Sequence, residues 1–178
     1  MATRSGLQKW FPDFFDKHQA YTVFDLLADY IKSGRIKLDK SMFVERMAYH
    51  DPCNYGRKSE EIFGHGYYEE PRWVLDQFVP NWVDLYPAKA NGYCCGGGGG
   101  TLLTPYKDER LHYARRKIEQ IKRVNAEMIV IPCHSCHGQI KSVLAEEGVT
   151  DIQVKYLWEL VAEALTLPRA EDRRSPNI

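Results

Sequence analysis

The sequence predicts an α/β fold, with a mainly parallel sheet flanked by helices and with cysteines at the carboxyl ends of strands. Short apolar segments alternate along the chain with longer segments of helical period, and this alternation is typical of parallel sheets. A second observation is that every cysteine follows one of the predicted strands. With 178 residues, the chain is long enough for one domain with its own hydrophobic core.

The predicted strands are short segments that end next to polar residues or cysteines. Residues 127–132, with the sequence EMIVIP, form the clearest buried strand because four apolar side chains follow one another there. Further strands are expected at residues 46–50, 88–93 and 152–156. Residues 60–66 are expected to form a turn.

The predicted helices carry apolar residues at helical spacing and residues that begin or end helices. The first spans residues 22–33 and stops before a glycine, and the second spans residues 71–78 with Pro71 at its first position. Thr104 is expected to cap a long helix that ends near residue 125. Two more helices are expected, one after the last cysteine and running to about residue 147, the other at residues 158–165. The buried stripe of the long helix is expected to contain Leu111, Ala114, Ile118, Ile121 and Asn125, and its solvent-facing basic side Arg110, Arg115, Arg116, Lys117, Lys122 and Arg123.

The chain divides into three predicted segments. Residues 1–21 form an N-terminal arm, residues 22–167 form the cysteine-rich domain, and the charged tail at residues 168–178 is expected to be disordered. The 24 Lys and Arg residues balance 24 Asp and Glu residues, so net charge gives no pull toward nucleic acid, for which no motif is found either. No segment has the length and apolarity of a membrane span or of a secretory signal, so the expected compartment is the cytoplasm.

Five cysteines are the most informative residues of the chain. Their odd number and the adjacent pair fit a framework of disulfides badly, and thiols stay reduced in the cytoplasm. Because the carboxyl ends of parallel strands meet at one edge of a sheet, we expect all five thiols to converge there, although they are far apart in sequence. The sequence therefore predicts a metal or redox site formed by Cys53, Cys94, Cys95, Cys133 and Cys136.

Several chemistries compete for this site. A thioredoxin-like use of Cys133 and Cys136 leaves the other three cysteines idle, and haem attachment through the C-x-x-C-H pattern ending at His137 normally takes place outside the cytoplasm. Zinc needs four thiols, or three with His50 or His137, in a tetrahedron. Adjacent thiolates diverge, and thus reach different metals of one cluster more naturally, which favours iron–sulfur ligation.

The five glycines after the cysteine pair support a cluster. They match neither the P-loop nor the dinucleotide-binding pattern, since Thr101 and Leu102 follow them. Without Cβ atoms, Gly96 and Gly97 allow backbone N–H groups to approach sulfur closely.

The cysteine segments resemble a known family. YHDPCNYGR at residues 49–57, CCGGGG at 94–99 and CHSC at 133–136 are similar to the cysteine-rich CCG domain of heterodisulfide reductase subunits B and D and related iron–sulfur oxidoreductases. With HGYYEEPR at residues 65–72, they look most similar to the C-terminal part of DsrK, the catalytic subunit of the sulfite-reduction-associated membrane complex.

The resemblance implies a non-cubane [4Fe-4S] cluster held by all five cysteines, at which a disulfide or trisulfide is reduced or formed. It makes His50, His134 and His137 candidates for hydrogen bonds to the cluster or for proton delivery. Arg57 is expected to pair with an anionic group of the substrate or with Asp51. The alternative is a structural zinc-binding or non-redox interaction domain.

The implied partners are an electron-donating iron–sulfur or membrane haem subunit and a small sulfur carrier of DsrC type. This places the protein in the cytoplasm or at the inner face of the membrane through partner subunits, as part of dissimilatory sulfur metabolism. Neither the ferredoxin-like cysteine motif nor the second CCG domain through which electrons enter relatives is found in these residues. The chain is therefore expected to be either a fragment of a longer polypeptide or a subunit that receives electrons from a partner, and to be inactive in isolation. The basic side of the long helix is expected to be solvated, or else to dock an acidic redox partner.

Overall fold

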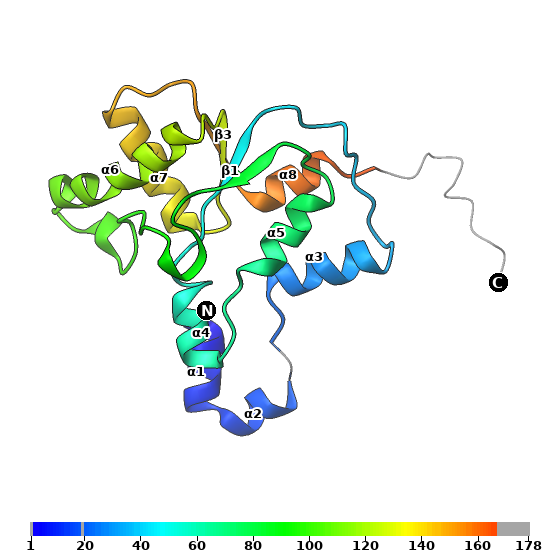
Figure 1. Cartoon of the computed structure of the whole chain (residues 1–178). Helices are drawn as coiled ribbons and strands as arrows, with labels where there is room; N and C mark the ends of the chain where they lie inside the picture. Colours follow the sequence, from blue (N-terminus) through cyan, green and yellow to red (C-terminus); the bar gives the residue numbers. More distant parts are fainter. Residues whose placement is uncertain (1, 19, 167–178) are drawn as a thin grey trace.

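The structure is a computed structural model that describes residues 2–18 and 20–166 (Figure 1). Its centre is a four-stranded sheet of β1 (Met47–Tyr49), β2 (Trp82–Asp84), β3 (Met128–Val130) and β4 (Gln153–Lys155). The strands lie in the order β2-β1-β3-β4 and all pairs are parallel. The predicted α/β fold class is therefore confirmed.

Strand order places a crevice at the centre of the sheet. From β1 the chain crosses to one neighbour, β2, and it then returns past β1 to form β3 on the other side. In such sheets the connections leave β1 and β3 in opposite directions, which opens a binding crevice beyond their carboxyl ends. Tyr49 pairs with Val130 at that end, so the residues that follow both strands emerge side by side.

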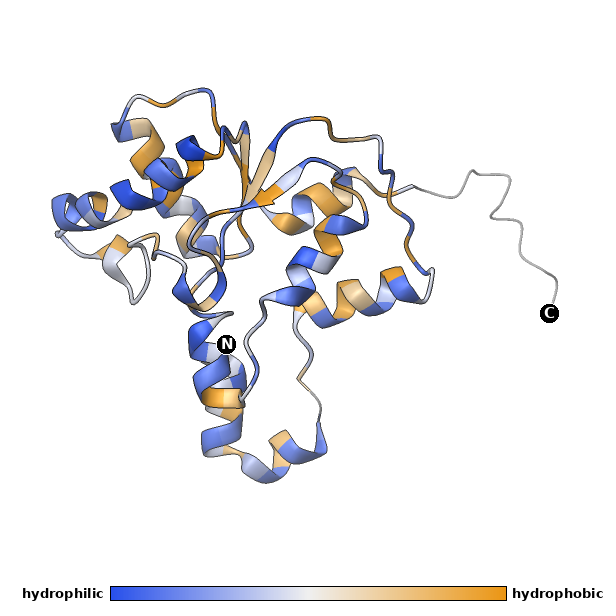
Figure 2. Ribbon diagram, viewed as in Figure 1, coloured by the Kyte–Doolittle hydropathy of each residue, from blue (hydrophilic) through white to orange (hydrophobic). Residues whose placement is uncertain are grey.

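Helices cover both faces of the sheet. One face packs against α3 (Val23–Lys32), α5 (Glu69–Asp76) and α8 (Leu157–Glu163), and the other packs against α6 (Lys107–Arg123) and α7 (His134–Glu146) (Figure 1). Because side chains alternate along a strand, β1 sends Met47 and Tyr49 to the first layer and Ala48 to the second. The hydrophobic faces of the helices turn inward in Figure 2.

The strand expected at residues 88–93 is wrong. The strand of this region is β2, which lies earlier in the chain, and residues 88–93 contain instead the 3-10 turn η1 (Lys89–Asn91). Here side chains form hydrogen bonds with the backbone groups that would otherwise pair with a neighbouring strand. Arg57 donates to the carbonyl groups of Ala90 and Gly92 at 2.9 and 2.8 Å, and the Lys89 N–H donates to Asp51 at 2.7 Å.

The region between β1 and β2 is also more helical than expected. The helix α4 (Arg57–Phe63) replaces the turn predicted at residues 60–66, and it ends at Gly64, which adopts the left-handed conformation with φ of 68°. The helix α5 is confirmed, but it begins at Glu69, so that Pro71 is its third residue. The backbone N–H that proline lacks is still unneeded there, since the first turn has no intrahelical acceptors.

The long helix α6 starts later than expected and ends as expected. Its first residue is Lys107 and its N-cap is Tyr106, while the hydroxyl of Thr104 donates to the carbonyl of Thr101, which lies in the 3-10 turn η2 (Thr101–Leu103). At the other end Asn125 lies beyond the helix with φ of 52°, so it is not part of the buried stripe. The remaining predicted stripe is confirmed, as Leu111, Ala114, Ile118 and Ile121 are all buried.

The N-terminal arm is helical in its described part, with α1 (Ala2–Trp10) and α2 (Pro12–Lys17). Arg4 of α1 contacts the domain through a hydrogen bond of 3.3 Å to the hydroxyl of Tyr67 and through the ring of Phe63, 4.4 Å away. The boundary at residue 21 stays a prediction, and the tail at residues 168–178 lies outside the described residues. Among the described helices, none combines the length and the apolarity that crossing a membrane requires.

Candidate metal centre

Cys53 is placed by the end of β1. The N–H of His50 donates to the carbonyl of Val130 at 3.0 Å, so the β1–β3 ladder continues one residue past the strand. The chain then turns through Asp51 and Pro52, and the half-buried Cys53 follows just before α4. The first cysteine thus lies at the carboxyl edge of the sheet, as predicted from its position after a strand.

Cys133 and Cys136 are placed by the junction of β3 and α7. Cys133 is the N-cap of α7, and Cys136 lies in its first turn, buried with 3% exposure. At the helix start the N–H groups of Ser135 and Cys136 have no intrahelical acceptor and lie near the Cys133 sulfur, which makes no capping hydrogen bond to them. The spacing of the two cysteines thus places one at the N-cap position of α7 and the other in its first turn.

Cys94 and Cys95 lie in the glycine-rich loop, ten and eleven residues after the last residue of β2. Cys94 is exposed and Cys95 is buried. Each sulfur accepts a hydrogen bond from a glycine N–H, Gly96 to Cys94 at 3.3 Å and Gly97 to Cys95 at 3.4 Å. The backbone groups of both glycines thus approach sulfur as the sequence predicted.

The two glycines have a second role that the sequence did not reveal. Gly96 has φ of 82°, and a Cβ atom there would lie 2.8 Å from the carbonyl oxygen of Arg110 in α6. A Cβ on Gly97 would lie 2.6 Å from the Cβ of Gln139 and 2.9 Å from the carbonyl oxygen of Ser135 in α7. The loop therefore packs directly on α6 and α7, and only glycine allows the approach.

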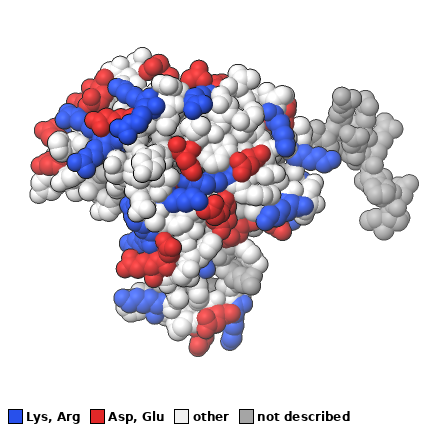
Figure 3. Space-filling view, in the orientation of Figure 1, with Lys and Arg blue, Asp and Glu red and all other residues white. Residues whose placement is uncertain are grey.

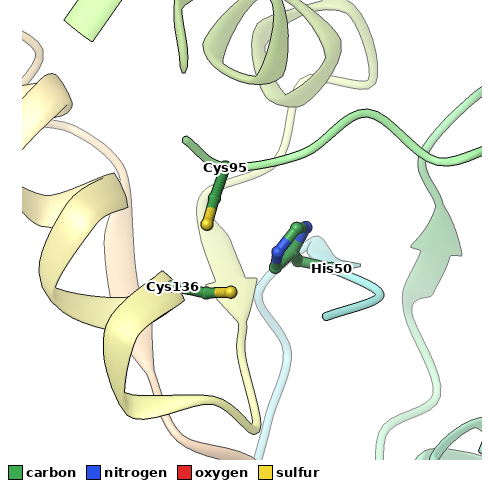
Figure 4. Close-up of side chains that lie close together, drawn as sticks. All are labelled: His50, Cys95 and Cys136. Carbon is green, nitrogen blue, oxygen red and sulfur yellow. The ribbon is translucent and has the colours of Figure 1, made fainter. Parts of the chain in front are cut away.

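The five thiols form one connected chain. Cys53 hydrogen-bonds to Cys94, Cys94 to its neighbour Cys95, Cys95 to Cys136, and Cys136 to Cys133. In the interior of this chain, the sulfur atoms of Cys95 and Cys136 and a ring nitrogen of His50 lie within 4.8 Å of one another (Figure 4). The structure thus brings all five predicted cysteines together, although they come from three separate connections of the sheet.

Hydrogen bonding within this chain separates the thiols into two kinds. Donation from Cys53 and Cys95 lowers the pKa of Cys94 to about 2, and donation from Cys136, with backbone N–H groups nearby, lowers that of Cys133 to about 6. Cys95 accepts from Cys136, but donation to Cys94 and burial outweigh this and raise its pKa to about 12. Donation to neighbouring sulfurs also raises the pKa of Cys53 and Cys136. Without a metal, the site therefore carries two thiolates, Cys94 and Cys133, at neutral pH.

Buried polar groups around the thiols lack partners. His50 is 1% exposed, and neither of its ring nitrogens has a hydrogen-bond partner among the described residues. Burial, helped by the charge of Lys117, holds the pKa of His50 well below its usual range. A neutral imidazole with both nitrogens unpaired beside two sulfur atoms can donate to, or bind, an occupant of the site.

The remaining predicted site residues lie farther from the centre of the thiol chain. His134 is exposed and shares a hydrogen bond of 2.6 Å with the hydroxyl of Tyr156, while His137 stacks on the same ring at 4.0 Å. Arg57 binds the backbone of residues 90 and 92, so the expected Arg57–Asp51 pair is not formed. Arg57 instead fixes the segment that leads to Cys94.

Sequence reasoning missed two buried cations. Arg72 donates to Asp51 with both terminal nitrogens, at 2.8 and 2.9 Å, and to Asp84 at 2.6 and 3.1 Å, which ties the end of β1 to the end of β2. Lys117 is 2% exposed, so its assignment to the solvated side of α6 is wrong. Its position on the same helical face as Ala114 and Ile121 could have indicated burial. Its charge instead led to the prediction that it faces solvent.

The charges at the surface show no single-sign patch on the face seen in Figure 3, where acidic and basic groups are intermixed. Two basic residues of α6 pair with the end of α7, Lys107 with Glu146 at 3.0 Å and Arg115 with Glu147 at 2.9 Å. These pairs join the helices that flank the glycine-rich loop.

Comparison with known families finds a match to the CCG model, described as a cysteine-rich domain, over residues 47–141. This range contains all five cysteines and every strand except β4.

Similar proteins are iron–sulfur or oxidoreductase proteins by name. The chain is 32% identical, over 76% of its length, to a probable membrane-anchored ferredoxin of Chromohalobacter salexigens, of which it covers 19%. It is 30% identical to the EtfAB:quinone oxidoreductase of Syntrophomonas wolfei, covering 87% of this chain and 22% of that protein. It is also 30% identical to the Hdr-like menaquinol oxidoreductase iron-sulfur subunit 2 of Archaeoglobus fulgidus, over 89% of this chain and 29% of that protein.

The chain thus spans less than a third of these curated relatives. No solved structure matches it.

Proposed function

Because this chain belongs to the CCG cysteine-rich domain family, we propose that its five cysteines hold a non-cubane [4Fe-4S] cluster at which a disulfide or trisulfide is reduced or formed. The carrying observation is the unbroken chain of five thiols at the carboxyl edge of the sheet. A mononuclear tetrahedral site uses four ligands, whereas five adjacent thiols suit a cluster of several metals.

The surroundings of the thiols fit an anionic, hydrogen-bond-accepting occupant. Both ring nitrogens of His50 are buried without partners among the described residues, and the N–H groups of Gly96 and Gly97 already point at sulfur. Buried polar groups are normally paired, so these groups support an occupant that accepts hydrogen bonds. The ligands proposed for it are Cys53, Cys94, Cys95, Cys133 and Cys136.

The reaction adds two electrons and two protons to a disulfide, breaks its S–S bond and yields two thiols; the reverse reaction forms the bond. When bound, the cluster supplies the electrons singly in two successive transfers. Exposure of Cys94 beside the exposed Gly99 and Gly100 gives a substrate its approach, while Cys95 and Cys136 keep the inner side of the site from water.

Electrons have to come from another protein or domain. The proposed donor is an iron–sulfur or membrane haem subunit, and the proposed substrate carrier is a small DsrC-type protein, as in the DsrK-like subfamily of dissimilatory sulfur metabolism. Among relatives, the name of the Archaeoglobus fulgidus subunit refers to menaquinol oxidation, which supports a place beside the membrane. The proposed location is therefore the cytoplasm, at the inner face of the membrane through partner subunits.

One observation favours a second candidate, a structural zinc site. His50, Cys95 and Cys136 bring three ligand atoms within 4.8 Å, which is compact enough for one tetrahedral ion with a fourth ligand. Such a site leaves at least two of the five thiols unused.

Metal analysis of anaerobically purified and reconstituted protein tests the proposal. We expect about four iron atoms and about four sulfides per chain, a brown chromophore and an EPR signal that is altered by a thiol substrate. About one zinc per chain with no colour after reconstitution would contradict the proposal and support the structural zinc site.

A further inference from the structure

Lys117 is a buried cation that makes no hydrogen bond or close ion pair with the described residues. It is 2% exposed, and its ammonium group makes no hydrogen bond or ion pair with any described side chain or backbone group. Other lysines, such as Lys155 with Glu163 at 2.7 Å, pair at the surface. Placing a charged ammonium in a largely buried position is costly, so a lysine of this kind requires an explanation.

Lys117 lies on the face of α6 that is turned toward the carboxyl edge of the sheet, where the cysteines lie. The carbonyl of Arg110 and the side chain of Ala114 approach Gly96, which follows the cysteine pair. Residues 110, 114 and 117 are spaced by four and three positions and therefore share one face of the helix. The face that carries Lys117 is thus the face on which the glycine-rich loop rests.

The groups around the ammonium identify what it faces. Lys117 interacts electrostatically with Asp51 and with the sulfur atoms of Cys94, Cys95 and Cys136, and also with the ring of His50. Asp51 is already held by both terminal nitrogens of Arg72. The negative charge left for Lys117 is therefore that of the thiol site itself.

We propose that Lys117 is the buried counter-charge of the cluster and that it sets the cluster's reduction potential. This inference rests on the proposed function. A fixed positive charge in a medium of low dielectric constant stabilises the reduced, more negative form over the oxidised form. Lys117 acts through its charge, without being a ligand, and so controls how readily electrons reach the substrate.

The test compares two lysines of the same helix in the full chain. Lys117→Met removes the buried charge and keeps the length of the side chain, while Lys122→Met removes an exposed charge from α6. In potentiometric titrations of the reconstituted proteins, followed by EPR, Lys117→Met should disfavour one-electron reduction about tenfold or more, a shift of about 59 mV to more negative potential. Lys122→Met should titrate like the wild type because solvent screens its charge.

A second readout uses the same variants without metal. Lys117→Met should unfold at higher urea concentration than the wild type, since the cost of burying the ammonium exceeds its attraction to Asp51 and the thiols. Equal potentials for Lys117→Met and Lys122→Met, or a Lys117→Met protein that unfolds at lower urea concentration or fails to fold, would overturn the inference. A wild-type protein that takes up no iron would instead contradict the proposed function, and the metal-free comparison then shows whether Lys117 is a structural residue.

Discussion

Two buried cations lie on opposite sides of the sheet edge, and only one of them is paired. Arg72, 5% exposed, donates to two carboxylates and to the carbonyl of Tyr68 at 2.6 Å. Lys117, 2% exposed, makes no hydrogen bond to any described residue and interacts with Asp51 and the thiols only electrostatically. The hydrogen bonds of Arg72 are therefore all made within the folded chain. The charge of Lys117 instead faces the thiol site, where an occupant is proposed.

The difference extends to the neighbours of both cations. Around Arg72, Asp51 also accepts from the N–H of Lys89, so the ends of β1 and β2 are joined by satisfied hydrogen bonds. Around Lys117, His50 keeps two unpaired nitrogens and the thiols bond only to one another and to backbone N–H groups. We conclude that the first region stabilises the fold and that the second is arranged for an occupant.

The largest effect on folding is expected for Arg72→Leu. The change leaves the buried carboxylate of Asp51 without its hydrogen bonds from the guanidinium and removes the partner of the exposed Asp84, which should lower the free energy of unfolding by about 3–5 kcal/mol. Urea denaturation of the metal-free protein measures it. Arg115→Leu, which removes the exposed partner of Glu147, should cost only about 0.5 kcal/mol. Similar costs for the two variants would show that the Arg72 cluster contributes no more than a surface pair.

A smaller effect is expected for Gly97→Ala. The new Cβ would lie 2.6 Å from the Cβ of Gln139, so α7 has to shift, at a cost of about 1–3 kcal/mol. Gly98→Ala is the matched control, because the nearest atom to its Cβ is the Cys53 sulfur at 4.0 Å. If Gly98→Ala were as destabilising as Gly97→Ala in the same urea titrations, close packing on α7 would not be the reason for the glycine.

The cysteine variants should separate the site from the fold. Cys95→Ser and Cys136→Ser should change the unfolding free energy of the metal-free protein by only about 1 kcal/mol, because the core packs without metal. Both should lose most of their iron after reconstitution. Cys95→Ser protein with unchanged iron content and EPR signal would mean that the adjacent cysteine is not a ligand.

The smallest effect concerns pH. Burial lowers the pKa of Lys117 from 10.5 to about 8. Between about pH 8 and 10.5 the unfolded chain therefore keeps a proton on this lysine that the folded chain has lost, so its contribution to stability rises with pH. The thiols, His50 and Asp51 that face it are present in both proteins, so the stability advantage of metal-free Lys117→Met over the wild type should shrink across this range. A constant advantage would contradict the burial of a charged lysine.

The sequence predicted the helices and strands that are marked by hydrophobic periodicity and by residues that typically begin or end such elements. The buried strand β3, the helix α3 and the apolar stripe of α6 were predicted because runs and spacings of apolar residues identify them. β2 was missed because it is a three-residue strand at the edge of the sheet, with no fully buried side chain, and thus has little hydrophobic signal.

The positions of those cysteines that directly follow a strand could be predicted from the topology of a parallel sheet. Cys53, Cys133 and Cys136 follow β1 and β3 directly, so their meeting follows from a parallel sheet. Cys94 and Cys95 were placed correctly although the strand assigned before them was wrong, because the loop after β2 returns to the same edge. The contributions of Arg72 and Lys117 depend on which charged groups are buried together, and a charged residue in a sequence gives no sign of that.

Anomalous diffraction at the iron edge from anaerobically grown crystals of the reconstituted protein is the most direct test of a cluster at the five thiols. We expect several iron positions between the sulfur atoms of Cys53, Cys94, Cys95, Cys133 and Cys136, with Lys117 facing them from α6. A single metal position bound by His50, Cys95 and Cys136, with the Cys53 sulfur left free, would contradict the account.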